Sequence, residues 1–140
     1  MISSNLKLVR KDWDKFTTKV DIKARSARDE MMVSLIQLSK EEIKGKRPPG
    51  EKATSGEPPM NRTGNLRRSI RGVKFRTGFA SYTALVGPTI EYGRAVELGG
   101  SYGPPNWTEG QNFPYMKPAY EKFRTHVFPQ IAQKYFGRGY

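Results

Sequence analysis

The segment WDKFTTKVDIKARSARDEMMVSLIQL (13–38) sets the architecture, because apolar residues recur along it at steps of three and four. The residues of this apolar stripe are Trp13, Phe16, Val20, Ala24, Ala27, Met31, Leu35 and Leu38. Their spacing matches the α-helical period of about 3.6 residues. We expect Asp12 or Asp14 to cap the start of this helix, and Gly45 with Pro48 to end it.

A helix of that extent is long for the chain. About 33 residues at roughly 1.5 Å each give a rod of about 50 Å, whereas a domain of 140 residues has a radius of gyration of about 14 Å. The helix therefore either bends over its own core or reaches past the domain toward a neighbour. Ala24 and Ala27 are small enough to let another helix approach closely.

Two long loops flank a predicted β-hairpin. Residues 45–64 and 99–115 are rich in Pro, Gly and polar residues, and the first is expected to be mobile. Between them, IRGVKFRTGFASYTALV (70–86) predicts a hairpin that turns at Thr77-Gly78. The expected pairs are Phe75 with Ala80, Val73 with Tyr82 and Arg71 with Ala84 on a mainly apolar face, and Lys74 with Ser81 and Arg76 with Phe79 on a basic face. A bulged three-residue turn is an alternative.

The rest of the chain predicts two further helices. EYGRAVELG (91–99) reads as a short helix that Gly99-Gly100 ends. Residues 116–136 read as a C-terminal helix that Pro129 kinks or splits. The apolar face of this helix comprises Met116, Tyr120, Phe123, Val127, Ile131 and Tyr135. The order of elements predicts a single α+β domain over 1–140, in which helices back a small antiparallel sheet.

Composition limits the possible functions. The chain has 140 residues and a mass of 15.9 kDa, which fits one domain. It carries 25 Lys and Arg against 13 Asp and Glu, a net charge of +12. This excess indicates a polyanionic partner, which is nucleic acid, an anionic membrane or an acidic protein surface. The absence of Cys excludes disulfides, thiol nucleophiles and Cys-based zinc sites.

No catalytic constellation is evident in the sequence. All four Asp residues fall within the first 29 residues, so paired carboxylates are not expected to converge. His126, the one His of the chain, is expected at or near the surface of a helix. There is no secretory leader, no run of about 18 apolar residues and no strongly amphipathic segment with a basic rim. We therefore expect a soluble intracellular protein without enzyme activity, metal, cofactor or membrane contact.

The positive charge is concentrated between residues 58 and 86, where six basic residues and no acidic one occur. With two more from the first loop, the candidates for facing a polyanion are Lys46, Arg47, Arg62, Arg67, Arg68, Arg71, Lys74 and Arg76. Most are Arg, whose planar guanidinium suits phosphate and carboxylate. Alternatively, the segment is a solubilising surface with salt bridges to the region of Glu91 and Glu97. No motif for sequence-specific readout occurs.

Three blocks carry a resemblance to a known family. They are PPMNRTGNLRRSI (58–70), YGRAVELGG (92–100) and PYMKPAY (114–120). In this order they resemble the gene-product-ten-like neck and tail-completion proteins of long-tailed bacteriophages. The matching residues are Arg62, Thr63, Gly64, Leu66, Arg67, Ser69, Ile70, Tyr92, Val96, Glu97, Gly99, Pro114, Tyr115, Pro118 and Ala119. Residues 101–113 depart from the family pattern, because they are longer than its usual stretch.

The resemblance implies a structural virion protein, made in the host cytoplasm and assembled at the head–tail junction. It implies a ring, sixfold first and twelvefold second, that contacts neck and tail proteins and passes double-stranded DNA without sequence specificity. A tail terminator that caps the tail tube, and a stand-alone nucleic-acid-binding protein, are the alternatives. Apart from Arg62, Arg67 and Ala119, the matching residues are the candidates for subunit contact.

The residues of the three blocks also support local expectations. Thr63 could cap a short helix over 64–69 that leaves Arg67 and Arg68 exposed. Leu66 and Ile70 would anchor that helix to the core. The Glu97 carboxylate could pair with an Arg of its own or of an adjacent subunit. Tyr92 and Val96 share a face and are either core or contact residues.

Overall fold

The chain folds as an α+β protein around one long helix, as the sequence predicts. The computed structural model describes residues 2–43, 54–59, 64–100 and 111–137, with side chains from residue 5 onward. The elements are α1 (Ile2–Glu42), α2 (Asn65–Ser69), β1 (Ile70–Gly78), β2 (Ser81–Pro88), α3 (Tyr92–Leu98), α4 (Met116–Lys122), the π-helical turn η1 (Phe123–Val127) and α5 (Phe128–Phe136). The candidates outside the described residues are Lys46, Arg47, Arg62 and Thr63.

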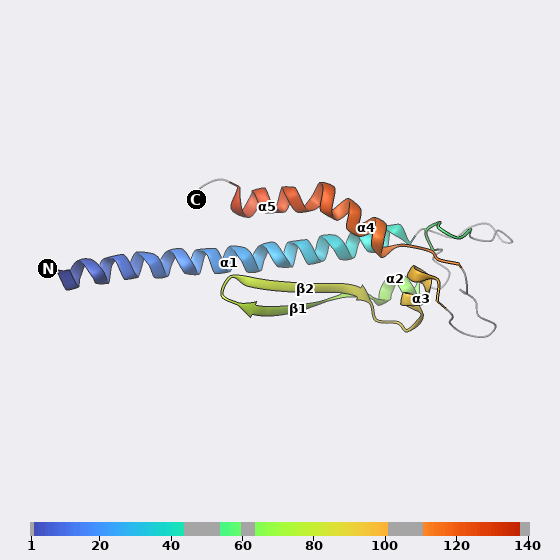
Figure 1. Cartoon of the computed structure of the whole chain (residues 1–140), viewed down its shortest axis with the longest axis horizontal. Helices are drawn as coiled ribbons and strands as arrows, with labels where there is room; N and C mark the ends of the chain where they lie inside the picture. Colours follow the sequence, from blue (N-terminus) through green and yellow to red (C-terminus); the bar gives the residue numbers. More distant parts are fainter. Residues whose placement is uncertain (1, 44–53, 60–63, 101–110, 138–140) are drawn as a thin grey trace.

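Helix α1 lies between the β1–β2 hairpin on one side and α4, η1 and α5 on the other (Figure 1). Helices α2 and α3 gather at its C-terminal end, while its N-terminal part extends past the hairpin and past α5 (Figure 1). At about 1.5 Å per residue, the 41 residues of α1 span roughly 60 Å. Of the two alternatives for the long helix, the one that reaches past its own domain is therefore observed.

The start of α1 differs from the prediction. The helix begins at Ile2, so Asp12 and Asp14 lie inside it and do not cap it. Residues 2–11, ISSNLKLVRK, contain neither Gly nor Pro, so no residue there stops the helix from extending toward the N-terminus. The helix ends at Glu42, shortly before the expected Gly45.

The register of the hairpin also differs from the prediction. The turn is Phe79-Ala80, and all of the expected pairs are wrong. The observed pairs include Lys74 with Ala84, Val73 with Leu85 and Arg76 with Tyr82, and a bulge separates Arg76 from Gly78. The shift turns the basic side chains toward α1 and leaves the apolar Val73, Phe75 and Leu85 exposed on the outer face. The apolar face of the hairpin is thus its outer face.

The core lies at the C-terminal end of α1. Ile43, Leu66, Ile70 and Tyr115 are buried together there. Leu66 and Ile70 anchor α2, as predicted, and leave Arg67 and Arg68 exposed. The helix starts one residue later than expected, because Gly64 with φ of 76° occupies the N-cap position and offers no side chain as a cap. Thr63 is therefore not the N-cap.

Residues 116–136 form one continuous helix, in which Pro129 disturbs the hydrogen bonding but does not split the element. The π-helical turn η1 lies between α4 and α5 just before Pro129, which has no N–H to continue the ladder of hydrogen bonds. Phe123 and Ile131 of the predicted apolar face are buried, but Tyr120 is 51% exposed. Ion pairs of Lys122 with Glu42 and of Lys134 with Glu30 fasten this element to α1.

The described parts of the two predicted loops hold each other. The N–H of Gly56 donates to the carbonyl oxygen of Asn112 at 2.7 Å. The hydroxyl of Ser55 donates to Asn112 Oδ1 at 3.0 Å, and the Asn112 N–H donates to Ser55 Oγ at 3.1 Å. The first loop was expected to be mobile, and residues 54–59 are instead fastened to the second loop.

Candidate functional site

Glu97 joins the second and third sequence blocks. Its carboxylate accepts hydrogen bonds from the backbone N–H groups of Tyr115 at 2.7 Å, Met116 at 2.9 Å and Lys117 at 2.9 Å. These three amides form the N-terminus of α4, where N–H groups lack helical partners and the helix dipole favours negative charge. The expectation that Glu97 pairs with an Arg of its own chain is therefore wrong.

The capping by Glu97 is complete. The next residue of α4 is Pro118, which has no N–H, so the first turn presents three donors and all three meet this carboxylate. Tyr115 itself offers no side-chain cap. The sequence holds a signal that could have indicated this cap. The start of α4 offers no Ser, Thr, Asp or Asn as an N-cap, so a capping side chain from elsewhere in the chain is to be expected.

Tyr115 is the centre of the buried cluster. Its ring is fully buried, and its hydroxyl donates to the Gly93 carbonyl oxygen at 3.0 Å. Burial, together with the nearby Glu97 charge, raises the pKa of Tyr115 well above its usual value. Tyr92 and Val96 pack against the same cluster, and Gly99 with φ of 78° ends α3. Of the two interpretations of Tyr92 and Val96, the structure thus places both side chains against the core.

Gly93 is a residue of the second block that the sequence analysis missed. A Cβ there would lie 2.6 Å from Cβ of Pro88 and 3.1 Å from the Tyr115 hydroxyl. Ser69 of the first block also has a structural role. Its carbonyl oxygen accepts two hydrogen bonds from Thr89, one from the backbone N–H at 3.0 Å and one from the side-chain hydroxyl at 3.1 Å. The described parts of the three blocks therefore converge in one packed region.

The basic candidates separate into two groups. Lys74 pairs with Asp29 and Arg76 with Asp21, both at 3.3 Å, so these two cations face carboxylates of α1. Lys74 and Arg76 thus form salt bridges, as one interpretation of this segment predicts, but to Asp29 and Asp21 and not to the expected Glu91 and Glu97. The side chains of Arg67, Arg68 and Arg71 are exposed on α2 and at the start of β1. Arg68 also donates to Asn65 Oδ1 at 2.7 Å, within α2 itself.

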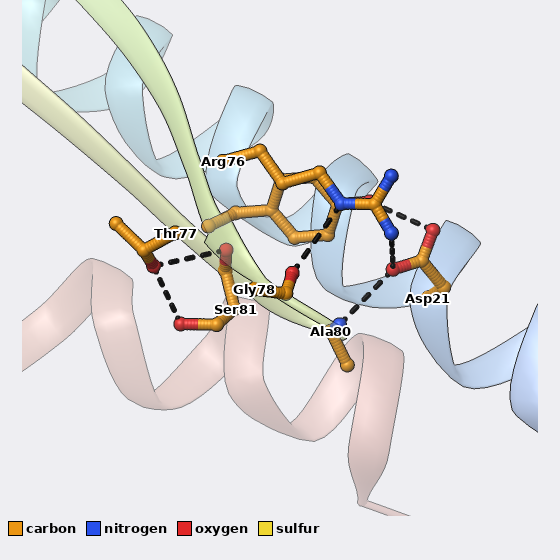
Figure 2. A network of polar contacts seen from close by, with 7 residues as sticks. Asp21, Arg76, Thr77, Gly78, Ala80 and Ser81 are labelled. Carbon is orange, nitrogen blue, oxygen red and sulfur yellow. Dashed lines mark hydrogen bonds and ion pairs between the residues drawn. The ribbon is translucent and has the colours of Figure 1, made fainter.

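Asp21 fixes the tip of the hairpin (Figure 2). Its Oδ1 accepts the Ala80 N–H at 3.0 Å and its Oδ2 accepts the Tyr82 hydroxyl at 2.7 Å. Ala80 has φ of 50°, a left-handed conformation that is uncommon for a residue with a side chain. The Tyr82 hydrogen bond, the Ala80 N–H and the charge of Arg76 hold the pKa of Asp21 below its usual value, and the bond to Asp21 raises the pKa of Tyr82.

An open apolar groove lies between β2 and the C-terminal element. Its volume is about 590 Å³. The stripe of α1 forms its floor through Ala24, Ala27, Met31 and Leu35, and Tyr120, Phe123 and Phe128 line the opposite wall. Ala24 and Ala27, expected to permit close approach of another helix, are thus at the base of a groove that is open on one side.

Within residues 5–43, 54–59, 64–100 and 111–137, no group of three His, Asp or Glu residues could hold a metal ion. His126 lies exposed in η1, as expected. None of the helices in these ranges has the length and apolarity that a membrane crossing requires.

Replacing Glu97 by Gln should destabilise the fold. Glu97→Gln weakens charge-assisted bonds to the amides of α4, so we expect a loss of about 1–3 kcal/mol in the free energy of unfolding. Denaturant unfolding followed by circular dichroism measures this loss. Glu91→Gln is the control, because Glu91 is exposed and makes no side-chain cap at α3. Equal stability of the two variants would contradict the capping role.

The docking of the hairpin should depend on pH through Asp21. Because the native pKa of Asp21 is lowered, its ionised form stabilises docking above the unfolded pKa of about 3.9, and this stabilisation is lost as the pH falls through the native value. We expect the Ala80 amide resonance to titrate with a midpoint below about 3.9. Asp21→Asn should abolish that titration, and Asp12→Asn should leave it unchanged. A titration that persists in Asp21→Asn would contradict this assignment.

The comparisons with known proteins add no relative to this picture. Neither protein-family models, nor curated proteins, nor solved structures match the chain. The likeness to neck and tail-completion proteins therefore rests on the three sequence blocks alone.

Proposed function

We propose that this chain is a structural subunit of a ring at the head–tail junction of a long-tailed bacteriophage, around the channel for double-stranded DNA. Six subunits are the first expectation and twelve the second. The observation that carries the proposal is the excess of exposed over buried apolar side chains. Among the described residues, eight hydrophobic side chains are buried, whereas fifteen large ones are exposed.

This excess favours a subunit over a free-standing protein. Most of the exposed side chains lie on the N-terminal part of α1, on the hairpin and along α4 and α5, whereas Val33 and Leu98 lie apart from these groups. Large apolar patches of this kind mark surfaces that other protein chains cover. The described residues of the three sequence blocks build the core that holds these apolar surfaces in place. The fold and the sequence blocks thus both support assembly of the chain with other protein subunits.

The exposed arginines support a polyanionic neighbour. Arg67, Arg68 and Arg71 lie close in sequence on α2 and β1, and all are exposed. Arginines in this arrangement would lower the cost of bringing DNA phosphates close without reading bases, so the duplex could slide. The stand-alone nucleic-acid-binding alternative is weaker than the sequence suggested, because Lys74 and Arg76 are engaged by α1. A tail terminator shares all of these features and differs in where it sits.

The location of the chain in phage particles tests the proposal. Separated heads, separated tails and complete particles of the phage that encodes the chain are labelled with an antibody against it and imaged by electron microscopy. We expect one labelled position per complete particle, between head and tail, and retention of the label on separated heads. Label confined to separated tails would support the terminator instead, and particles without label would overturn both structural roles.

A further inference from the structure

Residues 5–20 of α1, which we call the arm, carry a row of lysines on one face. The arm holds five cations and two aspartates. Four of the cations recur at every fourth position, and they are Lys7, Lys11, Lys15 and Lys19. All four are exposed and line one open hollow on the surface of the helix. In Figure 1 the arm projects beyond the hairpin and α5, so the row faces solvent.

The surroundings of these lysines differ from those of many cations in the body of the protein. Six Lys and Arg side chains of the body form ion pairs with carboxylates, and they are Arg28, Lys74, Arg76, Lys122, Arg124 and Lys134. Within residues 5–43, 54–59, 64–100 and 111–137, none of the four lysines of the arm has a carboxylate oxygen within 4.0 Å. Their positive charge is therefore available to a partner.

The lysine row and the apolar stripe lie on opposite sides of the arm. Successive lysines are four residues apart, which is about 6 Å along the helix axis and about 40° around it. The row from Lys7 to Lys19 therefore extends about 18 Å. Lys11 and Lys15, in the middle of the row, are each two residues from Trp13 and so lie about 160° from it around the helix.

We propose that this row binds the phosphate backbone of a nucleic-acid duplex without reading its sequence. Double-stranded DNA carries about one negative charge per 1.7 Å of its axis, so about 18 Å of duplex presents about ten phosphates. The ammonium group of lysine binds phosphate as a point charge, which positions the duplex but identifies no base. The proposal does not rest on the proposed function, because it concerns the arm of the single chain.

The shape and the composition of this face favour a duplex over a single strand. Proteins that bind single strands place aromatic rings among their cations, and successive bases stack on these rings. The aromatic residues of the arm, Trp13 and Phe16, belong to the apolar stripe instead. A duplex with a persistence length of about 50 nm is as straight as the helix over this distance. A flexible strand would lose conformational freedom on binding along the row.

The placement of the charges disfavours a membrane surface as the partner. A helix that lies in a membrane interface buries its apolar face among the lipid headgroups. With Trp13 buried in this way, Lys11 and Lys15 would point about 160° away from the lipid. Asp12 and Asp14, each about 100° from Trp13, would lie nearer to the anionic headgroups than these lysines. A membrane would therefore meet the acidic side chains before the middle of the lysine row.

The fixed spacing of the lysines also favours a nucleic acid over an acidic protein. A duplex repeats its charges at a constant interval along its axis, as the lysine row repeats its charges along the helix. Carboxylates on a protein surface have no such regular spacing. A duplex can therefore meet all four lysines at whatever position along its length it contacts the arm.

Substitution of the two central lysines tests the row. Fluorescence anisotropy of a labelled DNA duplex measures binding by the whole chain over a range of salt concentrations. We expect Lys11→Gln/Lys15→Gln to weaken binding at least tenfold at low salt. The slope of log K against log salt concentration should fall in magnitude by about 1.8, because each lost phosphate contact removes about 0.9. Two duplexes of unrelated sequence should bind within twofold of each other.

The matched control removes the same charge from the other end of the molecule. Arg94→Gln/Lys117→Gln replaces two exposed cations of α3 and α4. We expect this variant to change the affinity less than twofold and to leave the salt slope unchanged. Equal effects of the two double substitutions would overturn the lysine row as the binding surface. Circular dichroism verifies that the variants keep their helix content.

A gain of affinity tests the same face in a way that a folding defect does not mimic. Asp12→Asn/Asp14→Asn removes negative charge beside the row, so we expect binding to tighten at least twofold. Unchanged or weaker binding of this variant would contradict the proposal.

Three other probes test the class of partner. Tighter binding of a single strand of the same length would overturn the duplex. Binding of labelled poly-L-glutamate as tight as that of the duplex would overturn nucleic acid in favour of an acidic protein. Tighter binding to vesicles that contain phosphatidylserine would overturn it in favour of a membrane. None of these results bears on the label at the head–tail junction, so failure of this inference is distinct from failure of the proposed function.

Discussion

The length of α1 is the constraint on which the rest of the structure depends. A helix of 41 residues is about 60 Å long, whereas the hairpin and α5 accompany only part of it (Figure 1). The elements lie side by side with α1 in the middle, so one side of the stripe stays open. Stable domains bury such a stripe under a second layer, whereas the N-terminal part of the stripe on α1 is exposed, with Leu6, Val9 and Trp13 all more than 60% exposed.

The carboxylate of Glu97 has a comparable importance at the other end of the molecule. It ties the end of α3 to the start of α4 and so positions Tyr115 against Leu66 and Ile70. The described parts of three sequence blocks that are far apart along the chain become one packed region. Their side chains build the packed region from which the exposed arginines of α2 and β1 project.

Local sequence patterns predicted the helices and the hairpin, whereas contacts between residues far apart in the sequence determine the hairpin register, which the sequence did not predict. The apolar stripe of α1, the disturbance at Pro129 and the anchoring by Leu66 and Ile70 follow from periodicity and from the missing N–H of proline. The hairpin register does not, because Asp21, some 60 residues upstream, binds Ala80 and Tyr82 and so fixes the turn. A shift of register exchanges the two faces of a strand, which is why the expected basic outer face is apolar.

The four aspartates on α1 show how the same helix serves two purposes. Asp21 and Asp29 face the hairpin and neutralise Arg76 and Lys74, so the body of the protein uses acidic groups to hold basic strands. Asp12 and Asp14 lie exposed on the N-terminal part of α1, beside Lys11 and Lys15 of the same helix. Adjacent stretches of one helix therefore carry the same residue type in different surroundings. Arg67, Arg68 and Arg71 on α2 and β1 are exposed cations of the same predicted basic segment, in which Lys74 and Arg76 are paired with Asp29 and Asp21.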